Sequence, residues 1–305
     1  MTQPKLNRKI VCLICGIGAA VCYGTNPLGA LNLYAEGMAT GSVLFYRFGL
    51  AWLIIAAVVI ARGESLAVSW RQFGVLSALG VLFSASSLTL YLSFHHIAAG
   101  VASTLLFTYP VMTAVIMALF FGERITLRTA SSIALSLVGV VLLYWGGAEG
   151  RLSTLGVVLV LISALTYAVY IIVVGRSQLR MSPFKINFYV LIYCTLGALL
   201  YSLLSGTPIT LPQTGRSWFF VGWLAVVPAI MALVMMVYSA KYLGSTPTAI
   251  LGALEPLTAV MIGVLVFAEP FTLNLAIGIV LILSAVVIIA LKKESPDAIN
   301  NEKPR

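Results

Sequence analysis

A few polar side chains lie inside the apolar segments of this sequence, and they are its candidates for binding chemistry. Glu255 is the acidic residue deepest in such a segment, and Pro256 follows it directly. Burying a carboxylate costs several kcal/mol, so Glu255 is a candidate site for a proton or a cation. A structural alternative is that Glu255 ties a broken helix to its neighbour, because proline frees a backbone carbonyl one turn earlier.

Arg47 is a basic residue within an apolar segment, and its guanidinium could anchor the fold, act as a gate or contact a substrate. Buried hydroxyls and amides need partners, and several of them facing one cavity would suit an amphipathic or aromatic substrate. The alternative for each one is helix packing. The candidates of this kind are Tyr23, Asn26, Ser87, Tyr91, Tyr109 and Tyr238.

Cofactor and metal chemistry receive no support from the sequence. Its cysteines lie in apolar runs, where we expect packing, and His95 and His96 have no acidic or cysteine neighbour. Catalytic patterns such as H-E-x-x-H and G-x-S-x-G are absent, as is a nucleotide-binding loop. We therefore expect no cofactor, no bound metal and no enzymatic activity.

The composition indicates whether these residues lie in a soluble protein or in a membrane protein. The chain has 305 residues, of which 61% are hydrophobic and 9% charged, with a mean hydropathy of +1.06. Soluble domains carry roughly 25% charged residues. Charge this sparse excludes a soluble or nucleic-acid-binding protein despite the net charge of +9. It predicts an all-α integral membrane protein whose partners are the lipid bilayer and a small-molecule substrate.

Apolar stretches of about 20 residues predict ten transmembrane helices. They are Ile10–Leu33, Ser42–Ala61, Gln72–Phe94, Ala98–Phe121, Leu127–Trp145, Thr154–Gly175, Phe184–Ser205, Trp218–Lys241, Pro247–Ala268 and Thr272–Leu291. Proline interrupts helical hydrogen bonding. The candidate hinges are therefore Pro27, Pro110, Pro228 and Pro256.

The distribution of basic residues predicts the orientation. Of the 18 Lys and Arg, all but three fall in segments that lie on one side when the N-terminus is cytoplasmic. The exceptions are Arg47, within a span, and Arg151 and Arg216 on the other side. Both termini are expected in the cytoplasm of a bacterial cell, with the chain in the inner membrane.

The sequence also repeats itself at a separation of 146 residues. Pro110 matches Pro256 and Glu123 matches Glu269, within the related runs FGERITL and FAEPFTL. Each glutamate ends a helix, and Thr126 and Thr272 should cap the helices that follow. Because each copy holds five spans, the second must be inverted relative to the first.

This repeat divides the chain into five parts. Residues 1–9 form a cytoplasmic N-terminus and 146–153 an external linker, while 292–305 form a disordered cytoplasmic tail. The two five-helix repeats occupy residues 10–145 and 154–291.

With these motifs the chain resembles the drug/metabolite transporter superfamily, and within it the EamA-type transporters with ten helices. The matching runs are Tyr23-Gly24-Thr25-Asn26-Pro27, Tyr46-Arg47-Phe48, Pro110 to Gly122-Glu123-Arg124, and Glu255-Pro256 to Ala268-Glu269-Pro270. The resemblance implies secondary transport of small metabolites, often the export of amino acids or toxic compounds.

We therefore expect a monomeric secondary active transporter that exports small metabolites, with amino acids or related amphipathic compounds as the leading class, by alternating access. A proton is a candidate coupling ion at Glu255. The alternatives from other classes are a membrane-embedded enzyme and a passive channel. No nucleic-acid partner is expected.

Overall fold

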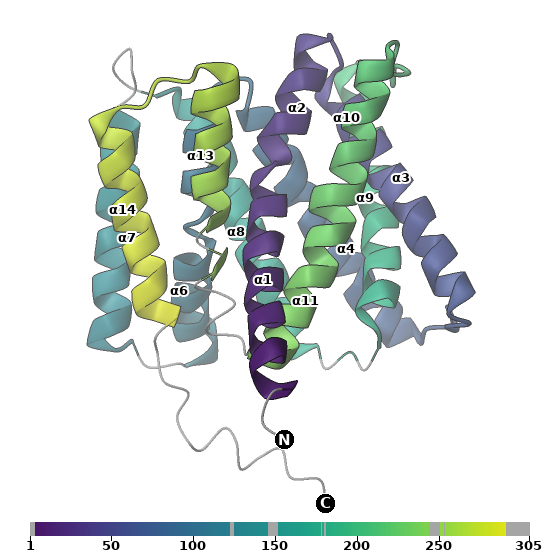
Figure 1. The fold of residues 1–305 in the computed structure, drawn as a ribbon, viewed down its shortest axis with the longest axis horizontal. Coiled ribbons are helices and arrows are strands. Elements are labelled where there is room, and N and C mark those ends of the chain that lie inside the picture. The colour runs from purple at the N-terminus through teal and green to yellow at the C-terminus, as the bar shows by residue number, and fades with distance from the viewer. Residues whose placement is uncertain are drawn as a thin grey trace, which may run out of the picture.

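The fold is a bundle of helices that run roughly along one common direction (Figure 1). The structure is a computed structural model and describes residues 4–122, 125–145, 152–177, 179, 181–243, 251–252 and 254–290. Its helices are α1 (Pro4–Gly24), α2 (Asn26–Ala35), α3 (Thr40–Ala61), α4 (Trp70–Ser93), α5 (Ala99–Leu106), α6 (Tyr109–Phe121), α7 (Leu127–Trp145), α8 (Thr154–Arg176), α9 (Pro183–Ser205), α10 (Gly215–Val226), the π-helix η1 (Val227–Met231), α11 (Ala232–Leu243), α13 (Leu254–Phe267) and α14 (Leu273–Ala290).

The helices have the length and composition of membrane spans. Seven helical stretches of the described residues are long and apolar enough to cross a bilayer, and three shorter helices are also apolar: Thr129–Trp145, Leu254–Phe267 and Leu273–Ile288. Large aliphatic side chains face outward on them, such as Leu119 at 70% exposure and Leu265 at 77%. The chain is therefore a multi-pass helical membrane protein.

Three of the predicted spans are interrupted. The first span is divided at Thr25 between α1 and α2, and the fourth at Phe107 and Thr108 between α5 and α6. The eighth is continuous in direction but widens into η1 around Pro228. A proline lies at or just after each interruption. Because proline has no backbone N–H, regular i to i−4 hydrogen bonding cannot continue there.

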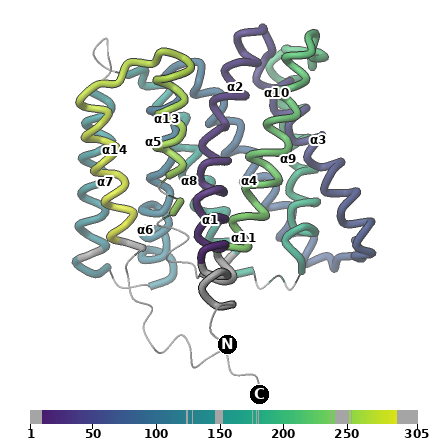
Figure 2. Tube along the Cα trace, in the orientation of Figure 1, coloured from purple at the N-terminus to yellow at the C-terminus, as the bar shows by residue number. Residues whose placement is uncertain are grey.

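Helices from the two halves of the chain pack against each other. Helix α3 packs on α9, α5 on α13, and α7 on α14, while α4 contacts α8 and α1 contacts α11. Figure 2 traces α5 beside α13 and α7 beside α14 although these segments are far apart in sequence. The beginning of α1 and the end of α14 lie on the same side of the bundle, and α10 begins on the opposite side (Figure 1).

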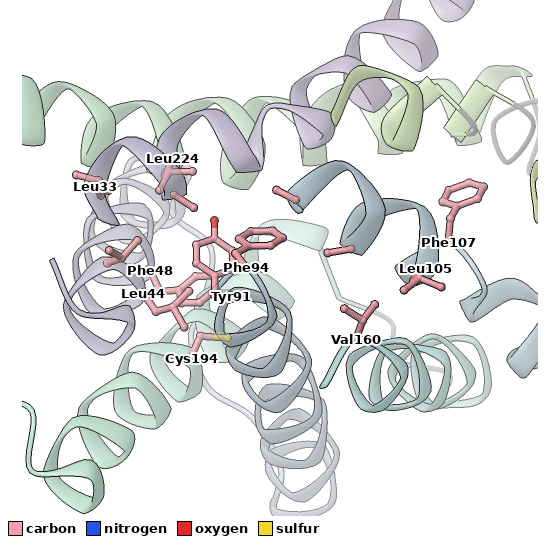
Figure 3. Close-up of a cluster of buried hydrophobic side chains, with 14 of the residues drawn as sticks. Leu33, Leu44, Phe48, Tyr91, Phe94, Leu105, Phe107, Val160, Cys194 and Leu224 are labelled. Atoms are coloured by element: carbon pink, nitrogen blue, oxygen red, sulfur yellow. The ribbon is translucent and has the colours of Figure 1, made fainter. Parts of the chain in front are cut away.

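The buried core is centred where α2, α3, α4 and α10 meet. Leu33, Leu44 and Phe48 are at most 1% exposed, and Figure 3 shows them grouped with Tyr91 and Leu224. The Tyr91 and Phe94 rings lie 5.5 Å apart. This packing fixes the α4 face that carries Tyr91.

The predicted helix caps are present where the structure describes them. Thr126 Oγ1 accepts from the Thr129 N–H at 3.3 Å, and Thr272 Oγ1 accepts from the Leu275 N–H at 3.1 Å. Both threonines cap as expected. The parts of the prediction that concern Glu123, Arg124, most of the linker and the tail fall outside the described residues.

Candidate functional site

A small cavity lies at the centre of the bundle and contains both charged residues singled out from the sequence. Its volume is about 80 Å³. Its walls come from nine helices: α1, α2, α3, α4, α5, α6, α8, α11 and α13. The lining residues are Tyr23, Asn26, Arg47, Phe83, Ser86, Ser87, Leu90, Tyr91, Leu106, Tyr109, Tyr167, Met236 and Glu255.

Two of these residues directly follow a break between helices, and a third precedes a proline within the described part of α13. Asn26, Tyr109 and Glu255 each directly precede a proline, and all three line the cavity. Asn26 and Tyr109 are the first residues of α2 and α6, so the breaks at Thr25 and at Phe107 and Thr108 place their side chains at the cavity. Tyr109 and Glu255 are also 146 positions apart, so they occupy matching places in the two repeats.

The interruption at Asn26 is stabilised by its own side chains. Pro27 has no N–H to donate to the Tyr23 carbonyl, and Asn26 Nδ2 donates to that carbonyl instead, at 2.8 Å. Thr25 Oγ1 donates to the Cys22 carbonyl at 2.7 Å. The break is therefore a built feature with satisfied backbone groups, as a break within a membrane must be.

Arg47 points into the bundle from α3 and is only 6% exposed. Its Nη1 donates to the Tyr91 hydroxyl, which in turn donates to Asn26 Oδ1 at 3.2 Å. The guanidinium lies 5.0 Å from the Phe48 ring centre and 5.2 Å from that of Tyr91. Its Nε has no hydrogen-bond partner among the described residues. The charge is held by one hydroxyl and two aromatic faces.

Glu255 approaches the cavity from the first turn of α13. Helix α13 comes close to α1 because residue 24 is glycine: a Cβ there would lie 2.6 Å from the Glu255 carbonyl oxygen. No hydrogen bond or ion pair joins the Glu255 carboxylate to another residue in the described part of the chain, Arg47 included. The two opposite charges share one cavity without pairing.

Aromatic rings form a further wall. The rings of Tyr109 and Tyr167 meet edge to face with their centres 4.8 Å apart. Tyr167 is stacked on Tyr170 at 5.8 Å, and Phe83 lies 6.2 Å from Tyr167. Such a cluster offers a rigid apolar surface with hydroxyl groups at its edge.

The structure brings seven of the eight candidate site residues together around this cavity and leaves one apart. The seven are Glu255, Tyr109, Tyr23, Asn26, Tyr91, Ser87 and Arg47. Tyr238 on α11 is 37% exposed and is not among the lining residues.

Six lining residues were not selected from the sequence: Phe83, Ser86, Leu90, Leu106, Tyr167 and Met236. The periodicity of α4 contained a signal for three of them. Phe83, Ser86 and Leu90 lie at helical spacing from Ser87 and Tyr91, so they share one face.

Three of the four candidate hinge prolines, Pro27, Pro110 and Pro228, lie at or next to a change in helix geometry. Pro27 and Pro110 are in the first turns of α2 and α6, directly after the two breaks. Pro228 lies in the π-helix η1, and Pro256 lies in the first turn of α13. Their role as hinges in motion stays a prediction.

Other parts of the described chain offer less chemistry. No three His, Cys, Asp or Glu side chains among these residues gather closely enough to hold a metal ion. A groove of about 470 Å³ between α6, α7 and α8 is lined by aliphatic side chains, with Thr108 and Ser136 as its polar members. It faces the lipid, because Leu137 and Leu165 in its wall are 61% and 46% exposed.

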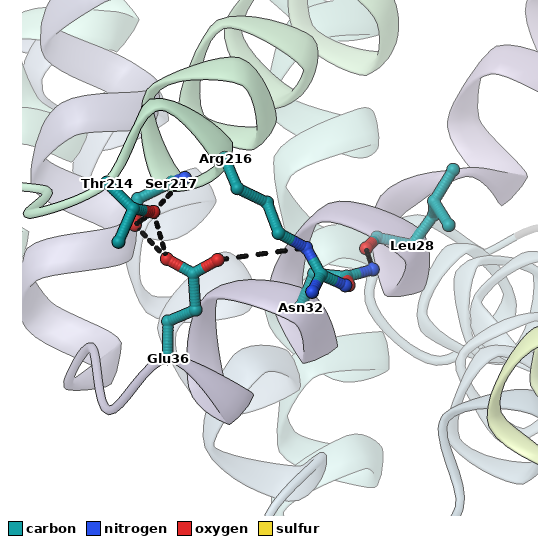
Figure 4. A network of polar contacts seen from close by, with 6 residues as sticks. All are labelled: Leu28, Asn32, Glu36, Thr214, Arg216 and Ser217. Carbon is teal, nitrogen blue, oxygen red and sulfur yellow. Dashed lines mark hydrogen bonds and ion pairs between the residues drawn. The ribbon is translucent and has the colours of Figure 1, made fainter.

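A polar network joins α2 to α10 at the end of the bundle where α10 begins (Figure 4). The Glu36 carboxylate accepts from the hydroxyl groups of Ser217 and of Thr214, the latter at 2.6 Å. Arg216 Nη2 donates to Asn32 Oδ1 at 2.5 Å, and its Nε lies 3.7 Å from Glu36 Oε1. The Ser217 hydroxyl, followed by that of Thr214, holds the pKa of Glu36 below its usual range.

Comparison with known proteins gives the family of this fold and site. The model of the EamA-like transporter family matches residues 10–145 and 154–291. An uncharacterized transporter of Archaeoglobus fulgidus is 27% identical over 275 residues, covering 88% of this chain and 94% of the relative. The uncharacterized inner membrane transporter YicL of Salmonella typhimurium is 25% identical over 285 residues, covering 90% of this chain and 93% of the relative.

A solved crystal structure has the same fold, with a TM-score of 0.66, 20% identity, and coverage of 96% of this chain and 99% of its own. The family model covers nearly all of the helical chain, including every helix that contributes to the central cavity. The chain therefore belongs to the EamA-like transporter family.

Proposed function

We propose that this transporter is a secondary active exporter of small amphipathic metabolites, with amino acids as the leading class, and that it works by alternating access at the central cavity. The observation that carries the proposal is the convergence of two interrupted helices and the Glu255-Pro256 segment of α13 on one cavity. The residues before Pro27, Pro110 and Pro256 meet there, together with Arg47. Transporters commonly bind their substrates where broken helices meet near the bilayer midplane.

The helix contacts support an inverted repeat of five and five spans. If the repeats match at an offset of 146, then α3 corresponds to α9, α7 to α14, and the α5–α6 segment to the segment that ends in α13. Each of these helices packs on its counterpart. At the same offset α1 corresponds to α8, and α4 corresponds to the segment of α10 and α11. The contact of α4 with α8 therefore matches the contact of α11 with α1. Such a bundle has two nearly equivalent packings, one open to each side.

The membrane side follows from the charge. Four basic residues lie at helix ends on the side of the bundle where α1 begins: Arg62, Arg71, Arg176 and Lys185. Arg216 lies on the opposite side, in the first turn of α10. Under the positive-inside rule the α1 side is cytoplasmic. A bacterial inner membrane with both termini in the cytoplasm fits this pattern, and it fits the name of the YicL relative.

Inside-out vesicles from cells that express the protein test the function. We expect one or more components of a mixed metabolite pool to accumulate in these vesicles and not in vesicles without the protein. Accumulation should respond to a pH gradient, and Glu255→Gln should abolish that response while the protein remains folded and inserted. Equal accumulation in both kinds of vesicle would contradict the proposal.

A further inference from the structure

The central cavity holds two opposite charges that the protein leaves unpaired. The described residues include no ion pair between Arg47 and Glu255, and no described residue binds the Glu255 carboxylate. Arg47 is only 6% exposed, and its Nε is buried without a hydrogen-bond partner among the described residues. Both groups line the same 80 Å³ space.

Charges in such a place are costly unless a partner neutralises them. A lone anion could satisfy Arg47 but would leave Glu255 to be neutralised by a proton alone, and a lone cation would leave Arg47 unpaired. A ligand with both charges satisfies both residues at once. A guanidinium also presents several donors in a fixed fork that matches a carboxylate, and the Tyr91 hydroxyl accepts from Nη1 alone.

We infer that the cavity is a two-pole site for a small zwitterion, in which Arg47 binds the carboxylate and Glu255 binds the ammonium group. This inference rests on the proposed transport function and specifies its substrate class. Tyr91 and Asn26 are positioning residues, because they hold the guanidinium through the Tyr91 hydroxyl. Apolar walls remain for the substrate's side chain and come from Phe83, Leu90, Leu106 and Met236.

The size of the cavity adds a constraint. At about 80 Å³ the cavity is small compared with the several hundred Å³ usual for a ligand pocket. A ligand with a short side chain therefore needs less separation of the walls than one with a long side chain.

Equilibrium binding to the purified full-length protein in detergent tests the inference with matched ligands. The probes are L-alanine, L-leucine and L-phenylalanine, each compared with the amine that lacks its carboxylate and the acid that lacks its ammonium group. In the wild-type protein we expect at least one of the amino acids to bind roughly tenfold or more tightly than either of its two analogues. An analogue that binds as tightly as its amino acid would overturn the two-pole assignment.

Variants assign the poles. Arg47→Gln should weaken amino-acid binding by about 10- to 100-fold, the range for a hydrogen bond to a charged group, and should leave binding of the amine within twofold. Glu255→Gln should weaken amino-acid binding similarly and spare binding of the acid. Arg71→Gln, which removes an exposed charge at the start of α4, is the matched control and should change neither.

Two further measurements test the inference if Arg47→Gln or Glu255→Gln fails to fold. Arg47→Lys retains the charge without the fork, and it should still lower the preference for the amino acid over its amine analogue. The wild-type comparison needs no variant. If vesicles transport a component of the metabolite pool but no amino acid in the panel binds, transport stands and the zwitterion site is wrong. If no component moves, the proposed function itself fails.

Discussion

Arg47 shows how a single residue can be buried in a membrane bundle without a carboxylate partner. The Tyr91 hydroxyl takes one guanidinium donor, and the Phe48 and Tyr91 rings lie close to the charge. Cation–π contacts contribute roughly 0.5–2 kcal/mol each, which is less than the cost of desolvating the ion. The remaining deficit is the physical reason for the proposal that Arg47 binds an anionic ligand group.

Glu36 is the residue from which we predict a pH dependence of stability. Its pKa is lowered by the hydroxyl of Ser217 and then by that of Thr214. A lowered pKa stabilises the folded state above the usual carboxyl value of about 4.3, and this contribution is lost as the pH falls through the lowered value. The melting temperature of Glu36→Gln should therefore lie below that of the wild type at pH 7, and the gap should narrow below about pH 4.

Melting curves in detergent across this pH range measure the gap. Arg71→Gln is the control, because it removes a charge without removing a carboxylate, and its difference from the wild type should not change with pH. A gap for Glu36→Gln that is constant from pH 7 to the acidic end would show that the network does not depend on the ionised carboxylate.

At the scale of elements, a residue from the second half of the chain caps a helix of the first half. Glu269 follows α13, and its Oε1 and Oε2 accept from the N–H groups of Ala99 and Gly100 at 2.7 and 3.1 Å. These groups begin α5, whose N-cap residue Ala98 has no side-chain cap. One carboxylate therefore satisfies two free donors and lies at the positive end of the helix dipole.

Removing this cap should loosen the start of α5. We expect Glu269→Ala to destabilise the protein by about 1–2 kcal/mol, the usual cost of losing a cap, and Glu269→Gln to cost less because its amide oxygen can still accept one bond. Amide hydrogen exchange at Ala99 and Gly100 should accelerate in the alanine variant. Unchanged exchange there would show that the cap does not stabilise this helix.

A substitution at Pro256 tests whether the start of α13 acts as a hinge. Replacing Pro256 with alanine restores an N–H that can donate to the carbonyl four residues earlier, which stiffens the start of α13. Because a hinge changes the barrier between states while contacts set affinity, Pro256→Ala should slow turnover several-fold and change substrate affinity less than twofold.

Transport rates measured beside equilibrium binding separate these effects. Pro183→Ala is the matched control, because Pro183 begins α9 at a position where proline interrupts no helix. Loss of binding in Pro256→Ala with normal turnover per bound substrate would mean that Pro256 shapes the cavity and is not a hinge.

At the scale of the whole molecule, pairing between the halves places the cavity at their interface. Tyr167, Met236 and Glu255 of the second half complete a lining that comes otherwise from the first half, so neither half encloses the cavity alone. Any relative movement of the halves must therefore change the cavity. This coupling is the structural requirement of alternating access.

The orientation of the molecule leads to a labelling prediction. In a background without its four native cysteines, which are free in the structure, a cysteine at Thr207 should react with an impermeant reagent in intact cells. A cysteine at Ser65 should react only after permeabilisation, because Ser65 lies on the opposite side, in the loop between α3 and α4. Labelling of both positions in intact cells would contradict the proposed topology.

The sequence alone determined the class of the protein, most helix ends and the sites of interruption. Helix α7 begins and ends at the predicted Leu127 and Trp145, because a bilayer requires a fixed apolar length. The interruptions were predictable because proline acts locally, through its missing N–H and fixed φ. Local chemistry also identified Arg47 and Glu255, since an ionisable residue in an apolar run is visible without a structure.

Only the tertiary structure decided which of these residues meet. Tyr91 contacts Arg47 across 44 positions, Glu269 caps a helix 170 positions away, and Tyr238 lies apart from the cavity that Tyr167 enters. Helical periodicity determines which side chains share a face, but every face of these helices is apolar enough to pack against protein or lipid. The choice between neighbours depends on the fit of whole helices, such as the approach of α13 to α1 at Gly24, and this fit is a property of the assembled bundle.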